Sequence, residues 1–117
     1  NMGKFISLAN AKEMTNRYQN ERENILNSSY QNKDILAISE TLEKDQLEKL
    51  LKLPGCEKIR IYYGMDSLLN VHAILVAVDK ENRDIIIQNE NAYEEEEDIL
   101  NDNVRCPPTC NTSQLIR

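Results

Sequence analysis

The sequence predicts an α+β fold in which an antiparallel sheet of three or four strands carries two helices packed on one face. Three patterns lead to this prediction. Residues 58–63 alternate between apolar and polar, as in a strand with one buried face. Residues 71–78 are apolar on both parities apart from one histidine, which predicts a central strand covered on both sides. Residues 8–26 and 43–52 place apolar side chains at helical spacing.

The size and charge of the chain limit the classes of protein to consider. Its 117 residues fit one domain, 1–117, with an acidic linker and a cysteine-containing tail at about 89–117. A net charge of −6 disfavours nucleic acid as a partner, because that affinity depends on clustered lysine and arginine. No apolar run reaches the ~20 residues that span a bilayer, and no signal peptide is recognisable. We therefore expect a soluble cytoplasmic protein that binds neither nucleic acid nor membrane.

The first helix is predicted over residues 8–26, and Ser7 can cap it by accepting a backbone N–H. Its second half is expected to fray, since residues 20–24 are mostly polar. One stripe collects apolar side chains that should pack on the sheet or, as an alternative, bind a partner; it consists of Ala11, Met14, Tyr18 and Ile25.

The next segment is predicted to hold a short strand and the second helix. After a polar turn at 28–34, the apolar run at 35–39 contains two isoleucines and favours a strand. Residues 43–52 form the helix, which Pro54 and Gly55 end. The apolar face of this helix comprises Leu47, Leu50 and Leu51.

The first long strand presents two different faces. Because side chains alternate, Arg60 and Tyr62 lie opposite the face that is predicted to meet the helices. That buried face contains Ile59, Ile61 and Tyr63. After the central strand, a hairpin connector at 80–83 should lead into a third antiparallel strand at 85–87. The acidic run Glu94 to Asp98 is expected to be solvated, since consecutive carboxylates do not match a calcium loop.

Three cysteines and one histidine are the chemically distinctive residues. Cys106 and Cys110 flank two prolines that stiffen the link between them, and Cys56 follows Pro-Gly. The cysteines could be structural, form a disulfide or redox pair, or bind a metal such as zinc with His72 or a water molecule as the fourth ligand. His72 shares a strand face with apolar residues, which also fits a histidine at the edge of the core.

Motifs of known catalytic sites are missing from the sequence. It contains no Gly-x-Ser-x-Gly elbow, phosphate-binding glycine loop or His-Glu-x-x-His helix. A cysteine nucleophile with His72 as base is the best candidate for covalent catalysis. Without further support for that pair, the sequence favours a protein that is not an enzyme.

Several short motifs together resemble a group of small uncharacterised proteins from Bacteroidetes. They are Pro54-Gly55-Cys56, Arg60-Ile61-Tyr62-Tyr63-Gly64, Val76-Ala77-Val78-Asp79 and Cys106-Pro107-Pro108-Thr109-Cys110. The resemblance covers about residues 5–110. It implies no activity, but it supports a role for the three cysteines. The chain departs from the group at residues 65–70, where a more polar turn is expected and Leu68 and Leu69 stand instead.

Two hypotheses of function follow. The first is a non-enzymatic binding or protein-interaction module that contacts another protein or a second copy of itself. Its expected binding surface comprises Arg60, Tyr62, Leu68 and Leu69. The second is a thiol-based metal-binding or redox protein that uses Cys56, Cys106 and Cys110.

Overall fold

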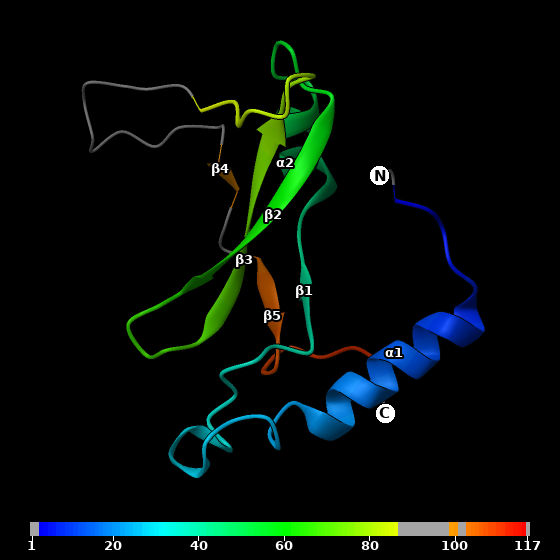
Figure 1. The fold of residues 1–117 in the computed structure, drawn as a ribbon, viewed down its shortest axis with the longest axis vertical. Helices are drawn as coiled ribbons and strands as arrows, with labels where there is room; N and C mark the ends of the chain where they lie inside the picture. The colour runs from blue at the N-terminus through cyan, green and yellow to red at the C-terminus, as the bar shows by residue number, and fades with distance from the viewer. Residues whose placement is uncertain (1–2, 87–98, 101–102, 117) are drawn as a thin grey trace. The chain divides into compact units, whose positions relative to one another are not determined.

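A computed structural model describes residues 3–86, 99–100 and 103–116 of the chain (Figure 1). The described strands form two sheets, one with strand order β1-β5 and one with order β2-β3-β4. Helices and antiparallel strands occur together, so the predicted α+β class is confirmed. The elements in chain order are α1 (Leu8–Glu21), the 3-10 turn η1 (Ser28–Tyr30), β1 (Ser39–Thr41), α2 (Lys44–Leu51), β2 (Lys58–Met65), β3 (Val71–Val78), β4 (Ile99–Leu100) and β5 (Val104–Cys106).

The chain divides into two compact units. The terminal unit comprises residues 1–39 and 105–117, and the hairpin unit comprises residues 40–104. The cysteine-containing tail thus belongs with α1, whereas the predicted acidic run at 94–98 lies outside the described residues. The prediction of one domain for the whole chain stays a prediction, and each unit is described separately below.

Helix α1 of the terminal unit begins where the sequence predicts and ends earlier. The Ser7 hydroxyl accepts the Asn10 amide at 3.1 Å, as expected for the cap. The helix stops at Glu21, and the predicted residues 22–26 form turns. No residue of α1 is buried, and the predicted packing of its apolar stripe on a sheet stays a prediction.

The segment predicted as a strand at 35–39 is irregular, and β1 begins only at Ser39. The reason lies in the hydrogen bonds of its backbone. Arg105 donates to the carbonyl oxygens of Asp34 and Ile35 at 2.6 and 2.7 Å, so a side chain takes the place of a neighbouring strand. Ile35 itself is buried, which explains why the run is apolar.

The hairpin unit follows the sequence pattern closely. Helix α2 lies within the predicted 43–52, contacts β3 and β4, and buries Leu50 almost completely. It is followed by Gly55 at a φ of 85°, a conformation that favours glycine. Strand β3 matches the predicted 71–78 and occupies the middle of its sheet, as expected. Its second half is the core of the unit, made of Leu75, Val76, Ala77 and Val78.

The third strand of this sheet differs from the prediction. The connector after β3 does turn back, but residues 84–86 make only a single bridge between Asp84 and Val78, and Ile87 lies outside the described residues. Instead β4 pairs antiparallel with β3, placing Ile99 opposite Val76. Within the described residues, Ile85 and Ile86 therefore lie outside any strand although isoleucine favours an extended conformation.

Candidate functional site

Strand β2 is an outer strand of its sheet, and the structure shows which of its backbone groups face outward. Asp66 donates its amide to the Asn70 carbonyl at 3.0 Å, which makes this pair a hydrogen-bonded one in the β2–β3 ladder. Hydrogen-bonded positions alternate along an antiparallel pair, so Gly64, Tyr62 and Arg60 also direct their backbone toward β3. The intervening residues direct theirs away from it; they are Ile59, Ile61, Tyr63 and Met65.

The opposite strand confirms this assignment. Ala77, the partner of Ile59, accepts the Ile85 amide on its far side at 2.9 Å. Ala73, the partner of Tyr63, donates to the Glu40 carboxylate at 2.8 Å. Both alanines thus use their backbone away from β2. Within the residues that the structure describes, no strand pairs with the outward side of β2.

Exposed apolar side chains accompany these backbone groups. Tyr63 and Leu68 are 78% and 77% exposed, and Met65 is 60% exposed. We call the set the apolar stripe; it comprises Ile61, Tyr63 and Met65 of β2 with Leu68 and Leu69 of the hairpin tip. Ile61 and Tyr63 were predicted to face the helices, and the structure corrects this because about half or more of each is exposed. A contiguous apolar surface of this kind is typical of an interaction site.

Arg60 and Tyr62, which the sequence analysis placed in a binding surface, are engaged within the hairpin unit. Arg60 forms an ion pair with Asp84, and the Tyr62 hydroxyl donates to the same carboxylate. Arg60 also donates to the Asn82 side chain at 2.7 Å. Asp84 therefore ties the connector after β3 to β2. The sequence analysis missed Asp84 because its two partners lie more than twenty positions away.

The hairpin tip is ordered by one carboxylate. Asp66 accepts the amides of Leu68 and Asn70 at 2.9 and 3.0 Å and bonds to His72 Nε2 at 2.7 Å. His72, followed by the two backbone amides, holds the pKa of Asp66 below its ordinary value of 3.8. This turn leaves Leu68 and Leu69 exposed, as the sequence predicts. An aspartate at the first position of the turn, whose side chain accepts the amide two residues later, was the signal for such a cap.

The proposed metal ligands have different surroundings. Cys56 is a free, half-buried thiol of the hairpin unit whose sulfur lies 3.5 Å from the Lys58 carbonyl oxygen. His72 is occupied by Asp66. Among the residues that the structure describes, no group of three or more histidine, cysteine or acidic side chains is arranged to hold a metal ion. A shared site for the three cysteines and His72 stays a prediction.

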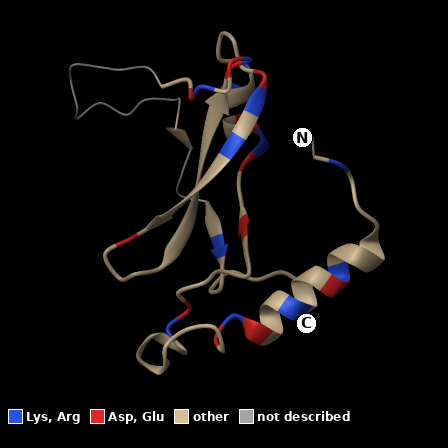
Figure 2. Ribbon diagram, in the orientation of Figure 1, with Lys and Arg blue, Asp and Glu red and all other residues tan. Residues whose placement is uncertain are grey.

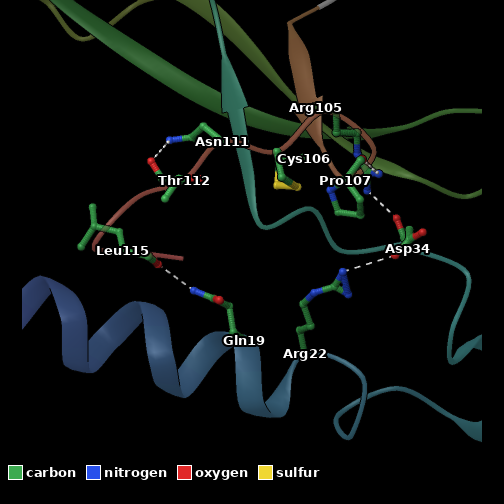
Figure 3. The surroundings of a disulfide bond; sticks show 10 residues. Gln19, Arg22, Asp34, Arg105, Cys106, Pro107, Asn111, Thr112 and Leu115 are labelled. Carbon is green, nitrogen blue, oxygen red and sulfur yellow. Dashed lines mark hydrogen bonds and ion pairs between the residues drawn. A yellow bond between two sulfur atoms is a disulfide. The ribbon is translucent and has the colours of Figure 1, made fainter. Parts of the chain in front are cut away.

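Cys106 and Cys110 form a disulfide in the terminal unit, with Cα atoms 4.8 Å apart (Figure 3). Cys106 is buried and accepts the Ile38 amide at 2.7 Å through its carbonyl oxygen, whereas Cys110 is exposed. Figure 3 also shows Arg105 next to the disulfide and near Asp34, whose carbonyl it bonds. The disulfide therefore closes a short loop directly after Arg105, whose side chain bonds to the backbone of Asp34 and Ile35.

Comparisons with protein-family models, with curated proteins and with solved structures give no match for this chain. None of the helices in the described part of the chain has both the length and the apolar character of a membrane-spanning segment.

Proposed function

We propose that the chain is a non-enzymatic protein-interaction module whose binding element is the outer side of β2 together with the apolar stripe. One observation carries the proposal: outward backbone groups and exposed apolar side chains coincide on the same strand. A row of open N–H and C=O groups is a template for another strand, and natural proteins usually blunt such an edge with charge or proline. Between Ile61 and Met65 the edge has neither.

The mode of binding that fits this surface is strand addition. An extended segment of the partner would bond to the outward backbone of Ile59, Ile61, Tyr63 and Met65, which supplies affinity without regard to side chains. Its alternate side chains would contact the apolar stripe, which supplies selectivity for apolar residues. The partner in this proposal is a protein and not nucleic acid, because the net charge of −6 repels phosphates.

The test is a selection of extended peptides from a random display library on the full chain. We expect the selected peptides to alternate apolar and polar residues and to lose binding to the Tyr63→Lys variant. Tyr30→Lys is the matched control, because Tyr30 is exposed and lies outside the hairpin unit. Hydrogen exchange should show new protection at the amides of Ile59, Ile61 and Tyr63 when a peptide binds. Binders that ignore Tyr63→Lys and leave these amides unprotected would refute the proposal.

A second candidate, a thiol-based redox or metal-binding function, is favoured by the pairing of Cys106 with the exposed Cys110. Exchange with an external dithiol would reduce the pair to two thiols while the dithiol is oxidised. Zinc binding, with Cys56 as a further ligand, would require that reduced state, because the ligand is the thiolate. Zinc titration of the reduced chain, with Cys110→Ser as control, separates a metal site from a pair that only exchanges disulfides.

The proposed cytoplasmic location has a consequence for this pair. Cytoplasmic thiol buffers keep ordinary disulfides reduced, so Cys106 and Cys110 should both react with an alkylating reagent in intact cells. Two alkylated cysteines in the tail would support that location. A pair that stays protected until a reductant is added would place the chain in an oxidising compartment.

A further inference from the structure

We infer that the partner of the β2 edge is a second copy of this chain, bound antiparallel with Tyr62 of one copy opposite Tyr62 of the other. The inference rests on the proposed function, since it names the occupant of the same surface. It would join two three-stranded sheets into one continuous sheet across a two-fold axis. Three features of β2 lead to this arrangement: its backbone alternation, its charges and its apolar stripe.

Backbone alternation restricts the possible registers. Two copies present the same outward groups, so hydrogen-bonded pairs must join outward residues of one copy to outward residues of the other. The outward residues are the odd-numbered ones, 59 to 65. Registers that pair an odd-numbered residue of one copy with an even-numbered residue of the other are therefore excluded. Among the remaining ones, the side chains of the odd positions from both copies always share one face of the joined sheet.

The charges on β2 distinguish among these registers. Figure 2 shows basic residues along the first half of β2 and an acidic residue at its hairpin end. With Tyr62 at the two-fold axis, Lys58 of each copy stands opposite Asp66 of the other, and this occurs twice. Lys58 is exposed, and its neighbour across the interface is the Asp66 carboxylate of the hairpin tip, so side chains of opposite charge face each other.

The neighbouring registers lack this match. An axis at Ile61 places Lys58 opposite Gly64, and an axis at Arg60 brings two arginines together. An axis at Tyr63 places Arg60 opposite Asp66, but Arg60 is already bonded to Asp84 and Asn82. Within the residues that the structure describes, Lys58 makes no ion pair, and the Tyr62 register alone sets it opposite a carboxylate. That carboxylate, Asp66, also bonds to His72 Nε2, so Lys58 would be an additional partner of the same group.

The part of the apolar stripe that lies on β2, namely Ile61, Tyr63 and Met65, is covered in the same register. Ile61 of one copy stands opposite Tyr63 of the other, and Ile59 stands opposite Met65. An aromatic residue beside a β-branched one is a favourable cross-strand pair. Side chains that are 52% and 78% exposed in one copy would thus contact each other in two copies. The arrangement also removes the open edge of each sheet.

The first experiment is sedimentation equilibrium of the full chain over a range of concentrations. We expect a species of twice the 13.5 kDa chain mass. Lys58→Glu should raise the dissociation constant and abolish its increase with salt, because it places two acidic groups opposite each other. Lys52→Glu makes the same charge change at an exposed site after α2 and should leave association unchanged.

Disulfide trapping tests the register itself. In a Cys56→Ser background, Tyr62→Cys should form a cross-linked dimer on oxidation, since directly opposed residues of a pair without hydrogen bonds have Cα atoms about 4.5 Å apart. Tyr63→Cys is the control, because its counterpart is displaced by two positions, beyond the ~7 Å that a disulfide tolerates. Peptide mapping distinguishes the new bond from the Cys106–Cys110 disulfide.

The outcomes separate this inference from the proposed function. A chain that stays a monomer but selects peptides on β2 overturns the second copy and leaves the interaction module standing. A dimer that cross-links at Tyr63→Cys shows that the register is wrong. A dimer that is unaffected by Lys58→Glu and cross-links at neither Tyr62→Cys nor Tyr63→Cys shows that the β2 edge is not the interface. If Tyr62→Cys fails to fold, concentration-dependent protection of the Ile61 and Tyr63 amides in the unmodified chain decides.

Discussion

The two units of the molecule are held together by different kinds of interaction. Among the described residues of the hairpin unit, the buried ones are all apolar: Leu50 of α2 and four consecutive residues of β3. In the terminal unit two of the buried residues are arginines, and they accompany Ile35 and Cys106. No residue of helix α1 is buried, and two of its side chains bond to distant segments. Tyr18 donates to the Ala37 carbonyl at 2.6 Å, and Gln19 donates to the Leu115 carbonyl at 2.8 Å.

This difference explains why one unit follows its sequence pattern and the other does not. Apolar burial is non-directional and depends on periodicity, so any side chain of the right parity contributes. A buried arginine acts through donors of fixed geometry. Arg105 bonds to backbone carbonyls and Arg22 pairs with the carboxylates of Glu23 and Asp34, and no periodic pattern marks either set of partners. We expect the hairpin unit to respond to lost volume and the terminal unit to lost hydrogen bonds and to the lost disulfide.

The largest expected effect is the loss of core volume in the hairpin unit. Leu50→Ala should reduce the free energy of unfolding by about 2–5 kcal/mol, because Leu50 is almost completely buried and its truncation removes apolar contacts and leaves a cavity. Urea unfolding measures it. Leu51→Ala is the control, since Leu51 is half exposed and precedes the end of the same helix. Equal losses in the two variants would show that apolar burial does not dominate this unit.

Opening the disulfide is the next largest change. Cys110→Ser should cost about 2 kcal/mol, the estimate for closing a short loop in the unfolded chain. The replaced side chain is exposed, so the change adds no buried polar group. Cys56→Ser serves as control, since it removes a free thiol, and should have a much smaller effect. Thermal unfolding provides a second measurement. A reductant should lower the melting temperature of the unmodified chain by as much as Cys110→Ser does, and it should leave the melting temperature of Cys110→Ser unchanged.

Removing the buried arginine of the tail tests the polar half of the comparison. Arg105→Met keeps an unbranched apolar stem but leaves the carbonyls of Asp34 and Ile35 without this donor, which should cost about 1–3 kcal/mol. Arg83→Met is the control, because Arg83 is exposed and pairs only with surface carboxylates in the described residues. If Arg105→Met unfolds at the same urea concentration as the unmodified chain, the terminal unit does not depend on this arginine.

The smallest expected effect is the pH dependence of the hairpin tip. Because His72 and two amides lower the pKa of Asp66 in the folded chain, this carboxyl stabilises the fold fully above its ordinary value of 3.8. That stability is lost as pH falls through the lower folded value, since protonation then favours the unfolded chain. Asp66→Asn should therefore be less stable than the unmodified chain at neutral pH, with the difference narrowing below pH 3.8. A constant difference across this range would contradict the assignment.

The sequence by itself determined the elements whose pattern is regular. The Ser7 cap, α2 with its glycine after the end, and the full extent of β3 follow from local chemistry or periodicity that a few neighbouring residues specify. The exposure of Leu68 and Leu69 was also predictable, because the turn lies between two strands of opposite direction. The binding surface predicted from the sequence shares Leu68 and Leu69 with the five residues of the apolar stripe, and its role stays a prediction.

Only the tertiary structure decided which face of β2 is open. Alternation says that Ile61 and Arg60 lie on opposite faces, but which of the two faces is covered depends on elements that arrive from elsewhere in the chain. The same holds for Asp84, which takes up Arg60 and Tyr62, and for Arg105, which replaces a strand beside residues 34–35. Local sequence patterns determine the conformational preference of a segment. Its tertiary contacts involve residues far away in the sequence, and local patterns do not identify them.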